Sequence, residues 1–143
     1  GAMHRLRTRA SSDRGAAAVE FALVSVLLIT LLFGIIQYSF LFWESQSASR
    51  TAREVGRVAA VGTATCAEMQ AGADSQVPHK SVTIDVNFPA GPAVGDTVTA
   101  TVSFPYTKLG FPFVPVPGGD TASQSADVRI ENVTANSTDC ATP

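Results

Sequence analysis

The residue whose type and position most clearly indicate functional chemistry is Glu20, a carboxylate at the N-terminal edge of a long apolar segment. It lies just before Phe21, and the 23 residues from Phe21 to Trp43 contain no Asp, Glu, Lys, Arg or His. A carboxylate inside or beside such a segment is costly unless a cation meets it. Two simpler interpretations stay open: the side chain extends toward lipid headgroups, or the positive end of a helix dipole stabilises it.

The two cysteines, Cys66 and Cys140, are a second pair of residues with predictable chemistry. Paired cysteines in a small domain are usually bonded when the domain lies in an oxidising compartment. We therefore expect a disulfide that closes a loop of about 75 residues and stabilises the fold by about 4 kcal/mol in the chain-entropy model. Two unrelated thiols are the alternative.

Motifs for catalysis, metal binding or nucleic-acid binding are missing from the sequence. There is no Gly-rich phosphate loop, nucleophile elbow, HExxH or paired CxxC. His79 has no His or Cys at ligand spacing, and residues 58–143 carry a net charge of −5, which disfavours a nucleic-acid surface. The sequence therefore predicts no enzyme activity, no cofactor, no metal and no nucleic-acid partner.

The uncharged run from Phe21 to Trp43 predicts a membrane span. As a helix, 23 residues reach about 35 Å, enough to cross a hydrocarbon core of roughly 30 Å. A buried core helix or a cleaved secretory signal would be the alternatives. The flanks favour a retained span, because aromatic residues gather at the C-terminal end and arginines at the N-terminal end, namely Tyr38, Phe40, Phe42, Trp43 and Arg5, Arg7, Arg9, Arg14.

The charges also predict an orientation and a first set of boundaries. Residues 1–15 carry a net charge of +3, which places them in the cytoplasm as a basic leader and places the C-terminal part outside the cytoplasmic (inner) membrane. Gly1 and Ala2, before Met3, are interpreted as a tag-removal scar. We expect the transmembrane helix over residues 16–43.

The helical pattern continues beyond Trp43 with a different character. Small and apolar residues recur at steps of three and four and form one narrow stripe, made of Ala48, Ala52, Val55 and Ala59. Gly62 is a plausible end. We therefore expect one helix from about Ala16 to Val61, whose amphipathic extension occupies residues 44–62.

Residues 63–143 are predicted to form a small extracytoplasmic β domain. Apolar residues alternate with polar ones over 82–88, 98–104 and 126–130, which indicates three antiparallel strands whose apolar faces lie on the amphipathic half of the helix. The fold class is therefore α+β. A Pro-rich loop, residues 105–119, interrupts the strands. It either folds over the helix–sheet core or forms an exposed contact surface or a segment resting on the bilayer.

The N-terminal region resembles a known family of processed membrane proteins. A basic leader ends in Arg14 and Gly15, small residues follow, and Glu20 and Phe21 precede the long span, as in type IV pilin-like precursors. The sequence from Gly15 to Phe21 resembles that of the TadE-like pseudopilins of the Tad (tight adherence), or Flp, pilus system. The later run Ala52-Arg53-Glu54-Val55-Gly56-Arg57 is similar to that family as well. Commoner type IV pilins carry Gly-Phe-Thr-Leu-Ile-Glu at this junction, which favours the Tad branch.

The resemblance implies a type IV pilin-like fold and a role for each residue at the junction. A prepilin peptidase would cut between Gly15 and Ala16, and Glu20 would become the fifth residue of the mature chain. Glu20, with Phe21 beside it, would pair with the new amine of a neighbouring subunit and set the register between subunits. The implied partners are the peptidase, other pilin and pseudopilin subunits, the pilus assembly platform and the bilayer.

The function expected from this resemblance is that of a membrane-anchored pseudopilin or minor pilin required for Tad/Flp pilus assembly and adhesion. One alternative is an uncleaved, single-pass anchored module whose loop at 105–117 docks another envelope protein. Another is a secreted protein cut near residues 47–49. The sequence leaves open whether the protein lies at the tip, in the shaft, at the platform or on the cell surface.

Overall fold

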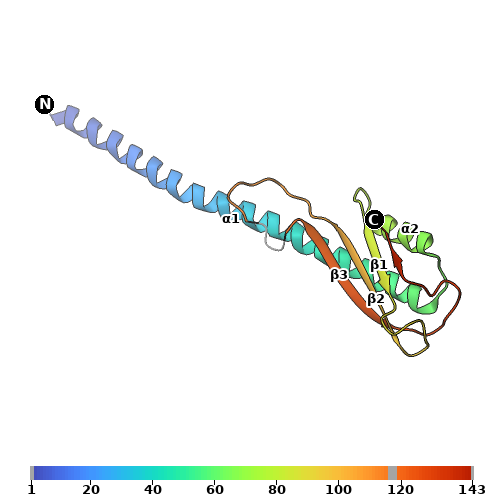
Figure 1. The fold of residues 1–143 in the computed structure, drawn as a ribbon. Coiled ribbons are helices and arrows are strands. Elements are labelled where there is room, and N and C mark those ends of the chain that lie inside the picture. Colours follow the sequence, from blue (N-terminus) through green and yellow to red (C-terminus); the bar gives the residue numbers. More distant parts are fainter. Residues whose placement is uncertain (1, 116–118, 143) are drawn as a thin grey trace. The chain divides into compact units, whose positions relative to one another are not determined.

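The computed structural model describes residues 2–115 and 119–142, with side chains described from residue 14 onward. The described chain forms two compact units. The first unit holds the chain up to Tyr38 together with Leu109–Pro115, and the second holds Ser39–Lys108 with the described residues from 119 onward. The arrangement is α+β, as the sequence predicted, and all its elements except β4 are labelled in Figure 1.

One helix, α1 (Ala2–Val61), runs through both units. It ends where the sequence predicted: Gly62 has a φ of +67°, and its N–H donates to the carbonyls of Val58 and Ala59 at 3.1 Å. The start differs from the predicted Ala16: α1 begins at Ala2 and so also includes the leader. The leader contains four arginines, which favour helices, and no proline.

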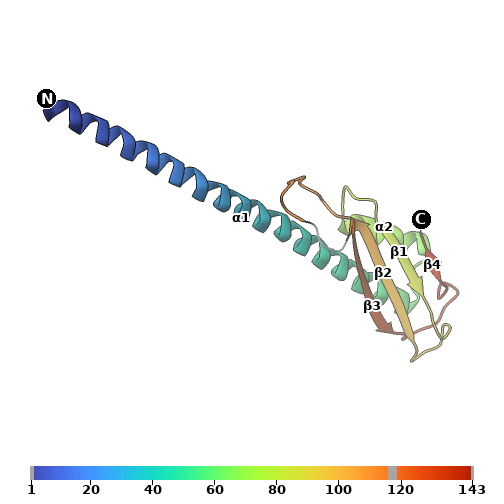
Figure 2. The ribbon, with the colours of Figure 1, turned by 60° about the vertical axis from the view of Figure 1, so that its left-hand side comes forward.

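The second unit contains a four-stranded antiparallel sheet, labelled in Figure 2. Its strands are β1 (Thr83–Asn87), β2 (Thr97–Pro105), β3 (Thr121–Arg129) and β4 (Cys140–Ala141), in the order β3-β2-β1-β4. The three predicted strands are present. Two details were not predicted: the short β4, and a β3 that begins at Thr121, because its polar first residues pair with the end of β2, down to Pro105 opposite Thr121.

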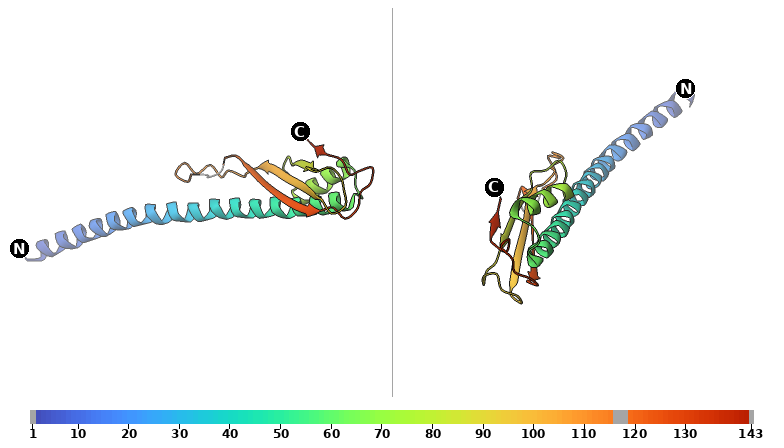
Figure 3. Two further views of the ribbon diagram at one scale, coloured as in Figure 1. Left: turned by 60° about the horizontal axis from the view of Figure 1, so that its bottom comes forward. Right: turned by 90° about the vertical axis from the view of Figure 1, so that its right-hand side faces the viewer.

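The predicted stripe on α1 lies in the core of this unit. Ala48 and Ala52 are fully buried and Val55 and Ala59 nearly so, packed with the inward residues of the sheet. Figure 3 shows the C-terminal part of α1 running along β2 and β3. The approach is close at Gly56, where an added Cβ would lie 2.9 Å from Val128 Cγ2. Small residues on this face therefore let the helix lie against the sheet.

A second helix, α2 (Cys66–Gln76), was not predicted. A capping box starts it, in which the Thr65 hydroxyl accepts from the Glu68 N–H and the Glu68 carboxylate accepts from the Thr65 N–H. Met69 and Ala73 bury the inner face of α2 in the core shared with α1 and the sheet.

The expected disulfide between Cys66 and Cys140 is present. It joins the first residue of α2 to β4, one of the two edge strands, across 74 residues of sequence, with the two Cα atoms 5.8 Å apart. It therefore ties both ends of the β domain to each other.

The central part of the Pro-rich loop groups with the apolar part of α1. Leu109–Pro115 belong to the unit that contains the apolar part of α1. The two prolines at 112 and 115 prevent a regular strand here. The remainder of the expected loop, residues 116–118, lies outside the described residues.

Candidate functional site

The predicted processing junction lies on the surface of α1. Gly15 and Ala16 are exposed, and no atom lies within 4 Å of the position that a Cβ on Gly15 would take. Phe21 is also exposed, to 74%. Nothing in the described part of the chain covers the bond between Gly15 and Ala16, although the helix continues through it.

Glu20 is exposed on the same helix and has no hydrogen-bond or ion-pair partner among the described residues. The neighbouring Ala17, Ala18 and Ala22 are exposed as well. The described part of the chain thus leaves the carboxylate, and the small residues around it, available to another group.

The apolar part of α1 presents a long exposed surface. Large hydrophobic side chains from Val19 to Ile35 are 38% to 71% exposed, apart from Phe21, which is higher still. By length and composition this is the one helix in the described residues apolar enough to cross a membrane. Such a surface is far more extensive than soluble monomers usually expose, so it needs lipid or other helices to cover it. A candidate membrane anchor is therefore present where the sequence placed it.

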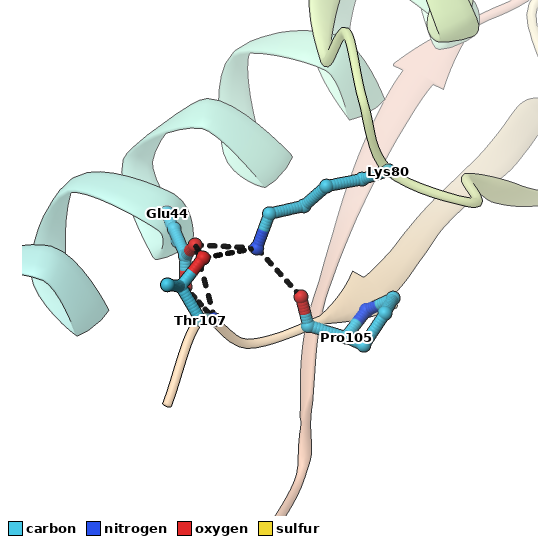
Figure 4. A network of polar contacts seen from close by, with 4 residues as sticks. All are labelled: Glu44, Lys80, Pro105 and Thr107. Atoms are coloured by element: carbon cyan, nitrogen blue, oxygen red, sulfur yellow. Dashed lines mark hydrogen bonds and ion pairs between the residues drawn. The ribbon is translucent and has the colours of Figure 1, made fainter. Parts of the chain in front are cut away.

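Glu44, the next residue after the apolar run, behaves differently from Glu20. Its side chain is 2% exposed and forms an ion pair with Lys80 (Figure 4). The Thr107 N–H donates to Glu44 Oε2 at 2.9 Å, and the Thr107 hydroxyl donates to Oε1 at 2.5 Å. The carboxylate is therefore fully satisfied inside the second unit.

Lys80 completes this polar cluster. Besides Glu44, its ammonium group donates to the carbonyl oxygen of Pro105 at 2.7 Å and to the Thr107 hydroxyl at 2.9 Å, as Figure 4 shows. The three donors of the ammonium are thus all used. The cluster fastens α1 both to the segment before β1 and to the beginning of the Pro-rich loop.

Burial and pairing act on Glu44 in opposite directions. Burial alone raises the pKa of a carboxyl group, but the bonds from Lys80 and Thr107 and the charge of Lys80 outweigh it, so that the pKa of Glu44 lies below its usual value of 4.5. Glu44 is therefore a structural anion at neutral pH.

Sequence reasoning missed the cluster of Glu44, Lys80 and Thr107. Glu44 and Lys80 are 36 residues apart, and Glu44 and Thr107 are 63 apart, so no local spacing connects them. The available signal was the position of Glu44 directly after the aromatic end of the span. The described residues hold no group of three or more His, Cys, Asp or Glu side chains that could bind a metal.

We predict that Glu44→Gln lowers the free energy of unfolding by about 3 kcal/mol at pH 7, because it leaves the Lys80 ammonium largely buried without its counter-charge. The folded-state pKa of Glu44 is lowered, so its stabilisation is present above about pH 4.5 and is lost as the pH falls through the folded pKa. The difference between wild type and variant should therefore shrink in acid. Denaturant unfolding of the full chain in detergent, at several pH values, measures it.

Two controls sharpen this prediction. Adding Lys80→Met to Glu44→Gln removes the unpaired charge and should restore much of the lost stability. Glu54→Gln, which removes an exposed pair with Arg57, should cost little. Equal stability of wild type and Glu44→Gln at pH 7 would show that the cluster does not fasten α1.

Comparisons with known proteins bear on the N-terminal region. Residues 15–57 match the family model described as TadE-like protein. Neither the curated proteins nor the solved structures gave a match to the chain. The matched range begins at the predicted junction and includes Glu20, the apolar run, Glu44 and most of the buried stripe. The resemblance seen in the sequence is thus confirmed: over residues 15–57 this chain is similar to TadE-like proteins, the family of Tad pilus components.

Proposed function

We propose that this protein is a pseudopilin or minor pilin of a Tad pilus, cut after Gly15 by a prepilin peptidase and then incorporated into, or priming, the fibre through α1. The observation that carries the proposal is Glu20, an exposed carboxylate without a partner in the described chain, at the start of the exposed apolar run. The TadE-like match over residues 15–57 supports it.

Pairing with a neighbouring subunit would remove the energetic cost of placing the Glu20 carboxylate beside an apolar segment. Cleavage would free the amine of Ala16, a cation at the end of an apolar helix, and the Glu20 carboxylate of a neighbouring subunit would meet it. Each charge removes the penalty of the other when lipid or packed helices shield them. Because such a pair forms at one axial offset only, it would set the register between subunits, as buried polar groups do in coiled coils.

The exposed alanines around Glu20 suit this arrangement. Small residues let helices approach closely in a membrane, so Ala17, Ala18 and Ala22 would bring the amine and the carboxylate of two subunits together. The disulfide between Cys66 and Cys140 supports an oxidising compartment for the β domain, and therefore a cytoplasmic N-terminus in the inner membrane. The other partners would be pilus subunits and the assembly platform.

A second candidate function is an uncleaved anchored module that binds another envelope protein. The observation that favours it is Phe113 in the Pro-rich loop, 81% exposed. In that case Glu20 would simply extend toward the headgroups and the leader would stay in place. Retention or loss of residues 1–15 in native membranes separates the two functions.

We predict that co-expression with the cognate prepilin peptidase removes residues 1–15, because the bond after Gly15 lies uncovered beside Glu20. The intact mass of the purified chain measures this. Gly15→Leu should stay full length, whereas Gly34→Ala, at another helical glycine with open space around it, should be processed like wild type. A wild-type chain that keeps its leader, while the same peptidase cuts a known prepilin, would rule out processing.

We predict that Glu20→Ala leaves membrane insertion intact and abolishes or strongly reduces pilus assembly, because the subunit amine then has no counter-charge. Membrane fractionation and the yield of sheared pili measure the two effects. Glu54→Ala, which removes a carboxylate exposed on α1 outside the apolar run, is the matched control and should assemble normally. Normal pili with Glu20→Ala would mean that this carboxylate does not set the register.

A further inference from the structure

The described part of the Pro-rich loop lies on the apolar helix within the first unit. The ring of Phe111 stacks on that of Phe33 of α1, with ring centroids 4.4 Å apart and an angle of 10° between the planes. Leu109–Pro115 contain no charged side chain. This segment, which we call the apolar finger (residues 109–115), is therefore held to α1 mainly by apolar contacts.

Between the apolar finger and α1 lies a cleft of about 220 Å³. Its lining is apolar except for Thr30, whose hydroxyl already donates to the Val26 carbonyl at 2.8 Å; the lining residues are Val26, Ile29, Thr30, Phe33, Phe111, Pro112, Phe113 and Val114. Phe113 is 81% exposed, which is unusual for a phenylalanine in water. The cleft and Phe113 can therefore contact an apolar occupant that forms no hydrogen bond.

The position of the cleft along α1 suggests the occupant. A span of about 20 residues covers Val26 to Phe33 whether it begins at Ala16 or at Phe21, since both choices enclose this range. Helix residues at that depth are surrounded by acyl chains. A segment that packs on them must therefore enter the same hydrocarbon layer.

Part of the backbone of the apolar finger is satisfied within the first unit, which matters because an unsatisfied polar group in that layer costs several kcal/mol. The Val114 N–H donates to the Phe111 carbonyl at 3.2 Å. The Leu109 N–H donates to Gln37 Oε1 at 3.1 Å, and the Pro115 carbonyl accepts from the Tyr38 hydroxyl at 3.0 Å. Both partners come from α1, so the helix itself satisfies the two ends of the finger. Pro112 and Pro115 have no N–H that would need an acceptor.

Charged residues flank the finger and do not enter it. Lys108 directly precedes it, and its ammonium pairs with the Asp120 carboxylate in the second unit. Charged groups at the base of an apolar segment are typical of the headgroup level. The order of residues therefore matches a short excursion into the lipid and back.

We propose that the apolar finger enters the outer leaflet of the membrane beside α1, and that phospholipid acyl chains fill the cleft and surround Phe113. The proposal rests on the membrane placement of α1 in the proposed function and adds a second membrane contact to it. Before assembly, this contact would hold the subunit against the bilayer in one rotational setting about α1.

The test places a fluorescent label on the full chain in phosphatidylcholine vesicles. Phe113→Cys gives a single reactive thiol, because Cys66 and Cys140 are bonded to each other. An environment-sensitive label there should lose its fluorescence to a spin-labelled phospholipid and be protected from aqueous iodide. Leu27→Cys on α1, at a side chain 71% exposed, is the lipid control, and Val94→Cys, 68% exposed between β1 and β2, is the aqueous control.

Each outcome of this test supports or overturns the proposal. Quenching at position 113 by lipid, as at position 27, supports it. Quenching at position 113 by iodide, together with quenching at position 27 by lipid, overturns the placement of the apolar finger in the membrane. It does not affect the proposed function. Quenching of position 27 by iodide overturns both. Protection of position 113 from both quenchers would mean that protein, such as a second copy, covers Phe113, and it overturns the assignment to lipid.

A second variant serves as an independent readout. Phe113→Trp in a Trp43→Phe background leaves one tryptophan, because the chain contains only Trp43. Its emission should shift to shorter wavelength on addition of vesicles. An unshifted emission would overturn the proposal.

Discussion

One uninterrupted helix in this protein has to satisfy two different surroundings, and the remaining structure depends on that constraint. From Glu44 onward, α1 places small residues against a sheet that the same chain supplies. Before Tyr38, most of the apolar side chains of the helix face outward. Water is a poor solvent for such a surface. The N-terminal half is therefore complete only with lipid or with other helices around it.

Two carboxylates on this helix illustrate the difference. Glu44 is buried, ion-paired and hydrogen-bonded within the chain. Its carboxylate therefore holds α1 to the β domain. Glu20 is exposed and has no partner in the described residues. The fold alone accounts for a buried charge that has partners. A carboxylate beside an apolar surface needs a counter-charge, and the described residues supply none to Glu20. For this reason the proposed function rests on Glu20 and not on Glu44.

Local patterns predicted much of the fold. The stripe containing Ala48 and Ala52, the alternating strands and the glycine end at Gly62 each follow from a period or a backbone preference that neighbouring residues carry. The helix α2 was missed although the capping box of Thr65 and Glu68 marks its start, because α2 is short and weakly apolar.

Features that depend on distant residues could not be predicted from the sequence. The pairing of Glu44 with Lys80 joins residues 36 apart, and the polar start of β3 is defined only by its partner β2. The contact between Phe33 and Phe111 likewise depends on tertiary structure. At the candidate site, the composition of the segment made Glu20 conspicuous, but whether its charge had a partner within the chain required the structure.

The central claim, that one helix crosses the membrane and continues into an external domain, is tested most directly by thiol labelling in intact cells that lack the peptidase. Single cysteines at Ser11, Leu27 and Arg50 sample the leader, the span and the exposed side of the extension. A membrane-impermeant maleimide should label Arg50→Cys from outside, Ser11→Cys only after permeabilisation, and Leu27→Cys in neither case. Labelling of Leu27→Cys from outside, or of Ser11→Cys in intact cells, would contradict the claim.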